Sequence, residues 1–142
     1  MSRSKIAAAC LFFLVAGCVT TYPKDAEDQA SYHLGDAKSA WAKGLCTRAS
    51  QEIDVTLSRL TGNSKVKEWF ATDPRSRDCY YAYHEKQIAD VTDANQAKAA
   101  YAKLAAVKAS GVFPDELTNS LNVSLTKKVV DGNVSGAVAF VL

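Results

Sequence analysis

Imidazole side chains, which titrate near neutral pH, are scarce in this sequence, and the best candidate for a site lies in residues 79–85. The chain has only two histidines. One of them belongs to the stretch CYYAYHE, the most aromatic part of the sequence. His84 and Glu85 do not form a catalytic dyad by adjacency, because neighbouring residues of a helix point about 100° apart. Two interpretations stay open: tyrosines divided between core and helix surface, or a partner-binding patch. The candidate patch comprises Tyr80, Tyr81, Tyr83 and His84.

Other signatures of catalysis or metal binding are missing. His33 follows an apolar stripe beside Leu34 and is expected to be a boundary residue of a helix. The sequence has no G-x-S-x-G nucleophile elbow and no G-x-x-x-x-G-K or G-x-G-x-x-G phosphate loop. Neither histidine stands at a zinc-finger spacing from a cysteine pair. We therefore expect no catalytic residue, no metal and no enzymatic activity.

The first 17 residues predict an export signal. Arg3 and Lys5 precede an apolar run over residues 6–16. That run is shorter than the roughly 20 residues that a membrane-spanning helix needs. A charged start, a short apolar stretch and small residues at its end are the layout of a secretory signal peptide.

Residues 15–18 read VAGC and resemble the lipobox of bacterial lipoproteins. The resemblance implies cleavage between Gly17 and Cys18, a diacylglycerol on the Cys18 thiol and an acyl chain on its new amino group. Two or three acyl chains make a lasting anchor, since each buried methylene contributes about 0.8 kcal/mol. No other cofactor is expected. An ordinary signal peptide with an incidental cysteine is the alternative.

The residue after the lipidated cysteine indicates which membrane would hold the protein. In Gram-negative lipoproteins Asp at that position commonly signals retention in the inner membrane, and here it is Val19. The resemblance therefore implies the periplasmic face of the outer membrane. In a Gram-positive cell the anchor would lie in the outer leaflet of the plasma membrane.

The composition of residues 18–142 excludes one class of partner. Loss of Arg3 and Lys5 lowers the number of Lys and Arg from 17 to 15, which equals the 15 Asp and Glu. No positive field remains for nucleic acid, so nucleic-acid binding is not expected. The remaining length suits one periplasmic domain with a core of its own, over residues 26–142.

The cysteines predict one disulfide. Cys10 leaves with the signal and Cys18 carries lipid, which leaves Cys46 and Cys79 in an oxidising compartment. A bridge between them closes a loop of about 34 residues, for which chain entropy gives roughly 3.5 to 4 kcal/mol. Two separate buried thiols are the alternative.

Apolar periodicity predicts a mainly α-helical fold. Residues 18–25 form a lipidated tether, and helices are expected over residues 26–110. The first helical stripe runs to Leu60 and is weakened at Gly44, where it either breaks or continues; Gly62 is a candidate C-cap. Asp73 with Pro74 predicts a helix start, and Ser110 with Gly111 predicts a helix end. Asp93 and Gln96 resemble a capping box and either start a third helix or lie within a continuous one.

The last part of the sequence changes character. The runs LNVSLTKKVV and VSGAVAFVL are rich in β-branched residues and flank DGN. This pattern predicts a β-hairpin over about residues 121–142, turning at Asp131 and Gly132. The expected fold is therefore a small helical bundle or hairpin stapled by one disulfide, with a C-terminal β-hairpin.

Together these features predict a non-catalytic lipoprotein that binds another protein of the cell envelope. One version is an accessory of a secretion system or pilus, since pilotins of type II secretion are likewise small helical lipoproteins. That likeness is architectural and carries over no binding residues. The alternatives are an immunity lipoprotein, or one that blocks an incoming conjugation machine, and a small cell-wall enzyme or ligand binder. The sequence leaves the oligomeric state open.

Overall fold

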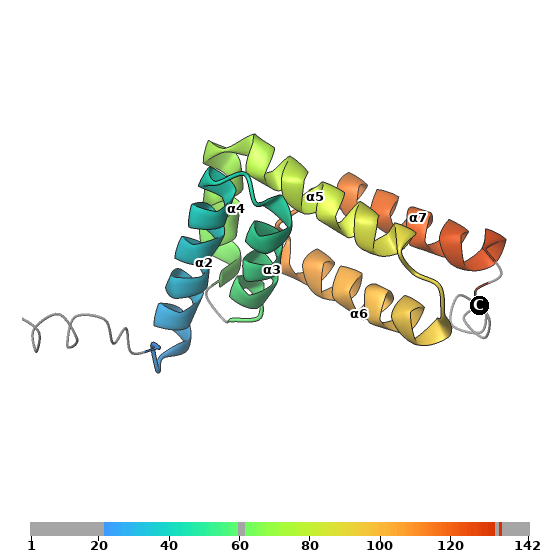
Figure 1. The fold of residues 1–142 in the computed structure, drawn as a ribbon, viewed down its shortest axis with the longest axis horizontal. Helices are drawn as coiled ribbons and strands as arrows, with labels where there is room; N and C mark the ends of the chain where they lie inside the picture. Colours follow the sequence, from blue (N-terminus) through green and yellow to red (C-terminus); the bar gives the residue numbers. More distant parts are fainter. Residues whose placement is uncertain (1–21, 60–61, 133, 135–142) are drawn as a thin grey trace, which may run out of the picture.

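The computed structural model describes residues 22–59, 62–132 and 134. The predicted signal peptide and the predicted lipidation site, with Gly17, Cys18 and Val19, lie outside these residues. The described part of the chain forms six helices and no strand: α2 (Ala26–Ala42), α3 (Cys46–Leu57), α4 (Gly62–Thr72), α5 (Pro74–Ala89), α6 (Ala94–Ser110) and α7 (Asp115–Asp131). They form two groups, with α2, α3 and α4 in one and α6 and α7 in the other, and the long helix α5 leads from the first to the second (Figure 1).

Helices α2 and α3 form an antiparallel pair at the N-terminal end. Helix α2 buries one face through Ala30, Leu34 and Ala37, at the spacing that the sequence predicts. The pair turns at Gly44, whose φ of 73° favours a residue without a side chain. The first stripe therefore breaks at Gly44 rather than continuing as one helix.

Four helix boundaries can be compared with the signals in the sequence. Helix α5 starts with Pro74 at its first position after Asp73, as predicted. Helix α6 begins after Asp93, whose carboxylate accepts a hydrogen bond from the Gln96 amide at 2.9 Å. It ends at Gly111 in the left-handed conformation. The prediction for Gly62 is wrong, because this residue begins α4 instead of ending the preceding helix.

The predicted C-terminal β-hairpin is wrong in its first half. Residues 115–131 form helix α7, and its buried side chains recur every three or four residues: Thr118, Leu121, Leu125 and Val129. That spacing places them on one helix face, which packs on the core. Burial of this face outweighs the strand preference of the β-branched residues, which is a weak and context-dependent effect. The second half of the predicted hairpin, residues 135–142, lies outside the described residues.

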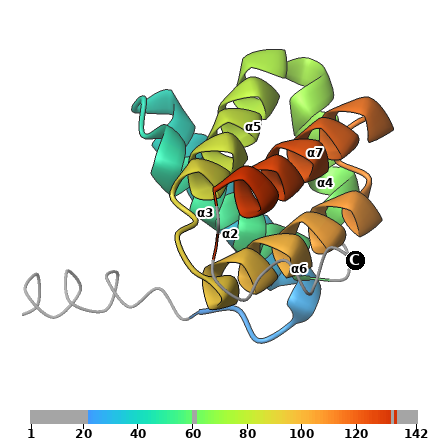
Figure 2. The same cartoon turned by 90° about the vertical axis from the view of Figure 1, so that its right-hand side faces the viewer.

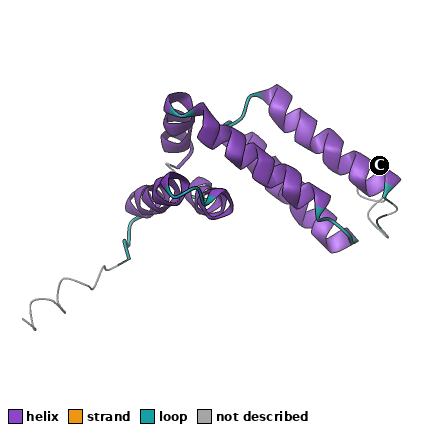
Figure 3. Cartoon of the chain, turned by 45° about the horizontal axis from the view of Figure 1, so that its top comes forward, coloured by secondary structure: helices purple, strands orange, loops and turns teal. Residues whose placement is uncertain are grey.

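The core lies where α5 meets the other helices. Viewed from the right-hand side of Figure 1, helices α5, α6 and α7 stand in front of α2 and α3 (Figure 2). Figure 3 shows that loops between consecutive helices, such as the one between α5 and α6, are short. Rings of Phe70 from α4, Tyr80 from α5 and Phe113 from the loop before α7 pack together with centroids 5.4 to 6.4 Å apart. These aromatic contacts connect the two groups.

Candidate functional site

The Cys46–Cys79 disulfide predicted from the sequence is present. It joins the first residue of α3 to the middle of α5, with the two Cα atoms 5.9 Å apart. The bridge therefore fixes α5 to the α2–α3 pair. This covalent link holds in place the part of α5 that carries the aromatic stretch.

The aromatic stretch contributes mainly to the core. Tyr80 is fully buried, His84 is 2% exposed and Tyr83 is 8% exposed. Tyr81 is only partly buried; its hydroxyl donates a hydrogen bond to Ser120 of α7 at 3.2 Å. The structure brings the four residues together but offers a partner little surface beyond Tyr81.

A polar cluster around Asp54, which no sequence pattern singles out, lies beneath this stretch. The Asp54 carboxylate accepts a hydrogen bond from the Tyr80 hydroxyl at 2.7 Å and from the Tyr83 hydroxyl at 3.4 Å. The ammonium group of Lys103 in α6 lies 2.7 Å from the same carboxylate. Lys103 also donates to Gln87 at 3.1 Å and lies 5.1 Å from the centre of the Tyr83 ring. We call these five residues the Asp54 cluster.

The pKa shifts in the Asp54 cluster keep Tyr80 and Lys103 protonated. Burial raises the pKa of Tyr80, and the negative charge of Asp54 raises it further. Burial works against the charge of Lys103, but its hydrogen bond to Asp54 and the charge of that carboxylate raise its pKa on balance. Tyr80 therefore stays a donor and Lys103 stays charged around neutral pH. The cluster braces α3, α5 and α6 against one another.

His84 sits beside the Asp54 cluster as a neutral ring. Burial lowers the pKa of His84 to about 4, and the nearby Lys103 charge lowers it while Asp54 opposes the shift. Its ring packs edge-on against Tyr80, with centroids 4.6 Å apart, and its Nε2 atom has no hydrogen-bond partner. A buried imidazole of this kind is uncharged at pH 7 and packs as an aromatic ring.

A second polar network fastens the tether to the α2–α3 pair. The hydroxyl of Tyr22 lies 2.8 Å from Nε2 of His33, and the Nδ1 atom of that ring lies 2.8 Å from the Glu52 carboxylate. Arg59, beyond the end of α3, donates to the Tyr22 hydroxyl at 3.4 Å. The rings of Tyr22 and Tyr32 meet edge to face, with centroids 5.6 Å apart. We call these five residues the tether end.

The sequence predicts that His33 lies at the boundary of a helix, but it does not predict the hydrogen-bond partners of this residue. His33 does lie on α2, and its role depends on Glu52 in the next helix. The signal that could have revealed the network is the turn at Gly44. A helix break there pairs the middle of α2 with the middle of α3, which places His33 and Glu52 at the same level.

Large exposed hydrophobic side chains gather in two places among the described residues. Tyr22 and Tyr32 belong to the tether end, and Val123 and Val130 lie on α7; Leu45 stands alone at the Gly44 turn. Val123 is 67% exposed and Val130 is 47% exposed. Their separation of seven residues, two helical turns, places them on one stripe of α7 that faces solvent.

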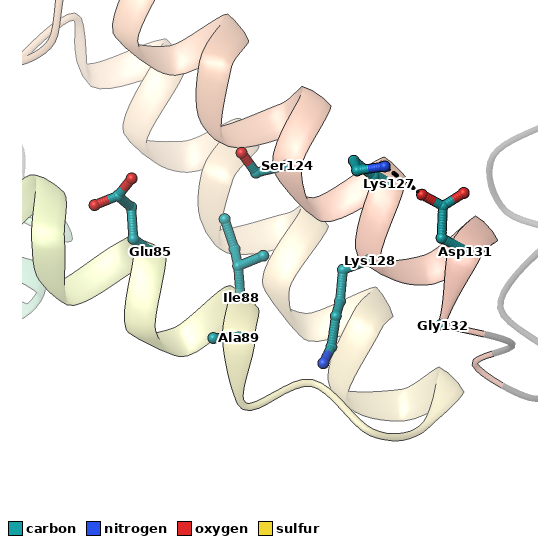
Figure 4. A pocket seen from close by; sticks show the side chains of 8 residues that line it. All are labelled: Glu85, Ile88, Ala89, Ser124, Lys127, Lys128, Asp131 and Gly132. Carbon is teal, nitrogen blue, oxygen red and sulfur yellow. Dashed lines mark hydrogen bonds and ion pairs between the residues drawn. The ribbon is translucent and has the colours of Figure 1, made fainter.

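One hollow lies over this stripe and a second lies beside it. One, of about 480 Å³, is lined by α7 residues that include Val123, Thr126 and Val130. The other, of about 540 Å³, lies between α5 and α7 (Figure 4). It is lined by Glu85, Ile88, Ala89, Ser124, Lys127, Lys128, Asp131 and Gly132. Lys127 and Asp131, which form an ion pair, line both hollows, so the two are neighbours on the surface. We call this region the α7 surface.

Metal-binding clusters and membrane-spanning helices are both absent from the part of the chain that the structure describes. It holds no group of three or more histidine, cysteine or acidic side chains placed to bind a metal ion. None of its helices combines the length and the apolar character needed to cross a bilayer.

Comparison with known proteins identifies no relative. No protein-family model, no curated protein and no solved structure matches this chain. Its function must therefore be inferred from the residues and their arrangement.

Proposed function

We propose that the protein is a non-catalytic lipoprotein held at the periplasmic face of the outer membrane, where its helical domain binds another cell-envelope protein. The observation that carries the proposal is the VAGC motif ending at Cys18, four residues ahead of Tyr22. Four extended residues span at most about 14 Å. Because Tyr22 is fastened to α2, acyl chains on Cys18 would hold the domain close to the bilayer.

The α7 surface supports the partner-binding part of the proposal. Two exposed valines two turns apart are the spacing at which one helix meets a second helix lying along it. The ion pair of Lys127 and Asp131 lies beside them and leaves the stripe without a dominant charge. The partner element that fits is an amphipathic helix of another envelope protein, with its apolar face over Val123 and Val130.

Tethering explains how such a small surface could suffice. Attachment to the membrane confines the domain to a thin layer and raises its effective concentration toward membrane-bound partners by orders of magnitude. A contact that is weak between freely diffusing proteins is then occupied. An accessory of a secretion system or pilus, of the pilotin kind, would work in this way.

Site-specific photo-crosslinking in intact cells tests the proposal. A photoreactive amino acid is placed at position 123 or 130 of the full-length chain, and at Ala105, an exposed residue of α6, as the matched control. We expect one envelope protein, identified by mass spectrometry, to be crosslinked from positions 123 and 130 and not from 105. Val130→Asp in the chain labelled at 123 should abolish the product, because it places a charge in the apolar contact.

Three results would count against the proposal. Crosslinks between two copies of this chain would show a homo-oligomer surface instead of a partner site. Equal yields at positions 123 and 105 would show random encounters. No product at either valine in cells that carry the lipidated protein would remove the α7 surface from consideration.

A further inference from the structure

We infer that the tether end lies against the phospholipid surface, so that the domain is held on the bilayer in one orientation. The inference rests on the proposed lipid attachment at Cys18 and adds a second, non-covalent contact to it. The partner of this contact is the headgroup layer of the membrane. The residues that would reach it are Tyr22 and Tyr32.

The short linker restricts which part of the domain can approach the membrane. Tyr22 is held by His33 and Arg59, and the Gln29 side chain donates to the carbonyl oxygens of Pro23 at 2.9 Å and Lys24 at 3.3 Å. The chain is thus fastened to the domain from its first described residue. Only residues 18–21 separate it from the proposed acyl group, so the tether end must lie within about 14 Å of the anchor.

The exposed side chains at this end suit a membrane interface. Tyr22 is 50% exposed and Tyr32 is 41% exposed. Tyrosine has an apolar ring and a polar hydroxyl, a combination that favours the headgroup level of a bilayer. Their rings are held edge to face, so both are presented from the same place on the domain. Contacts of this kind are weak alone but are strengthened by the covalent anchor beside them.

Charge does not explain an approach to the membrane. Lys24 and Arg59 are offset by the acidic residues at the start of α2, Asp25, Glu27 and Asp28. Residues 18–142 as a whole have equal numbers of acidic and basic side chains. Attraction to anionic lipid is therefore small, and the aromatic rings carry the contact.

The orientation has a consequence for the α7 surface. The start of α2 and the end of α7 lie toward opposite ends of the long axis of the molecule (Figure 1). With the tether end on the bilayer, the end of α7 points away from it. The α7 surface is then open to a partner instead of being pressed against lipid.

A chemically anchored sample tests the inference without depending on lipidation in cells. Residues 18–142, which contain every described residue, are coupled through Cys18 to a maleimide lipid in bilayer nanodiscs of phosphatidylethanolamine and phosphatidylglycerol. Cys46 and Cys79 are oxidised and do not react. A nitroxide on the lipid headgroup broadens the NMR signals of nearby amides. Failure of this experiment would leave the lipid anchor untouched, whereas an unmodified Cys18 in cells would leave this orientation without its cause.

The inference predicts selective broadening. Amides of residues 22–33 and of Arg59 should lose intensity, while those of residues 123–131 keep theirs. High salt should leave the pattern unchanged, since the contact is aromatic. Uniform broadening of both ends would show a domain that turns freely on its tether, and stronger broadening of α7 would reverse the orientation. Loss of the pattern in high salt would assign the contact to charge.

Paired variants separate the contribution of the tyrosines to the orientation from that of the linker. Tyr22→Ser combined with Tyr32→Ser should restore the signals of residues 26–33 and of Arg59, while residues 22–25 stay broadened because the short linker alone keeps them near the anchor. Val123→Ser combined with Val130→Ser removes two exposed apolar side chains from α7 and should keep the full pattern. Persistence of the full pattern without either tyrosine would overturn their role. Retained helical circular dichroism shows that both variants are folded.

Discussion

His84 is a buried side chain whose lowered pKa makes the stability of this fold depend on pH below neutrality. Its pKa is about 4 in the folded protein and its ordinary value is 6.5, so the unfolded chain binds the proton more readily. The stability that neutral His84 contributes is complete above pH 6.5 and is lost as the pH falls toward 4. A tenfold change in proton affinity corresponds to about 1.4 kcal/mol, so the loss over this pH range is about 3 kcal/mol.

Replacement of His84 tests this effect. In His84→Phe the free energy of unfolding should fall about 3 kcal/mol less between pH 7 and pH 4 than in the unchanged protein, measured by urea denaturation. At pH 7 the variant should be within about 1.5 kcal/mol of the unchanged protein, because a similar aromatic ring fills the site. Parallel acid profiles of the two proteins would contradict the lowered pKa.

Asp54 is the acceptor on which three helices depend. Asp54→Ala leaves the buried Tyr80 hydroxyl without its acceptor and Lys103 without its counter-ion, and should cost about 2–4 kcal/mol. Asp90→Ala is the matched control. It removes an acidic partner of Lys86 at the surface and should cost less than about 1 kcal/mol. Equal losses of unfolding free energy in the two variants, measured by urea denaturation, would show that the Asp54 cluster stabilises the fold no more than a surface ion pair does.

At the scale of elements, the link between α3 and α5 is covalent. Cys46→Ser combined with Cys79→Ser removes a bridge that closes a loop with a sequence separation of 33 residues. The free energy of unfolding should fall by roughly 3.5 to 4 kcal/mol, because the unfolded chain gains entropy. The double variant and the reduced protein should give the same result in urea denaturation. An unchanged urea midpoint in both would show that the disulfide does not stabilise the fold.

Helix α7 can be distinguished from a strand by two substitutions. A strand would place residues 123 and 125 on one face, whereas the helix exposes Val123 and buries Leu125 completely. Leu125→Ser should therefore cost about 3–5 kcal/mol and Val123→Ser about 0.5 kcal/mol or less, measured by urea denaturation. Similar costs for the two would favour the strand.

Helix ends can be recognised from the sequence more readily than helix α7 itself. Asp73 with Pro74, Asp93 and Gly111 mark helix boundaries correctly, because capping chemistry acts within a few residues. The β-branched residues of α7 favour strands locally. Leu121, Leu125 and Val129 recur every four residues, which is a helical period, but the β-branched residues and the DGN segment lead to the prediction of a hairpin. Packing of this face on α5 and α6 selects the helix.

The sites also differ in how far the sequence predicts them. The disulfide follows from cysteine number, but the partners of His33 and Asp54 lie in other helices. Neither spacing nor composition places Glu52 beside His33, or Lys103 beside Asp54. Such contacts depend on how the helices pack. The same is true of the aromatic stretch, which is recognisable in the sequence although its burial is not.

For the whole molecule, the two proposed surfaces lie at opposite ends. The tether end would stand on the bilayer, and the α7 surface would face a partner. The disulfide and the Asp54 cluster connect the helices between these ends. A rigid connection means that the orientation on the membrane determines how the partner surface is presented.

The roles proposed for both surfaces depend on a lipid at Cys18. The mass of the mature protein shows whether Cys18 carries that lipid. The full-length chain is made in bacteria, extracted from membranes and analysed by intact and peptide mass spectrometry. We expect a chain that begins at Cys18 and carries a diacylglycerol and an acyl chain, and a Cys18→Ala protein that has neither. An unmodified Cys18, or cleavage at another residue, would contradict the proposed anchor.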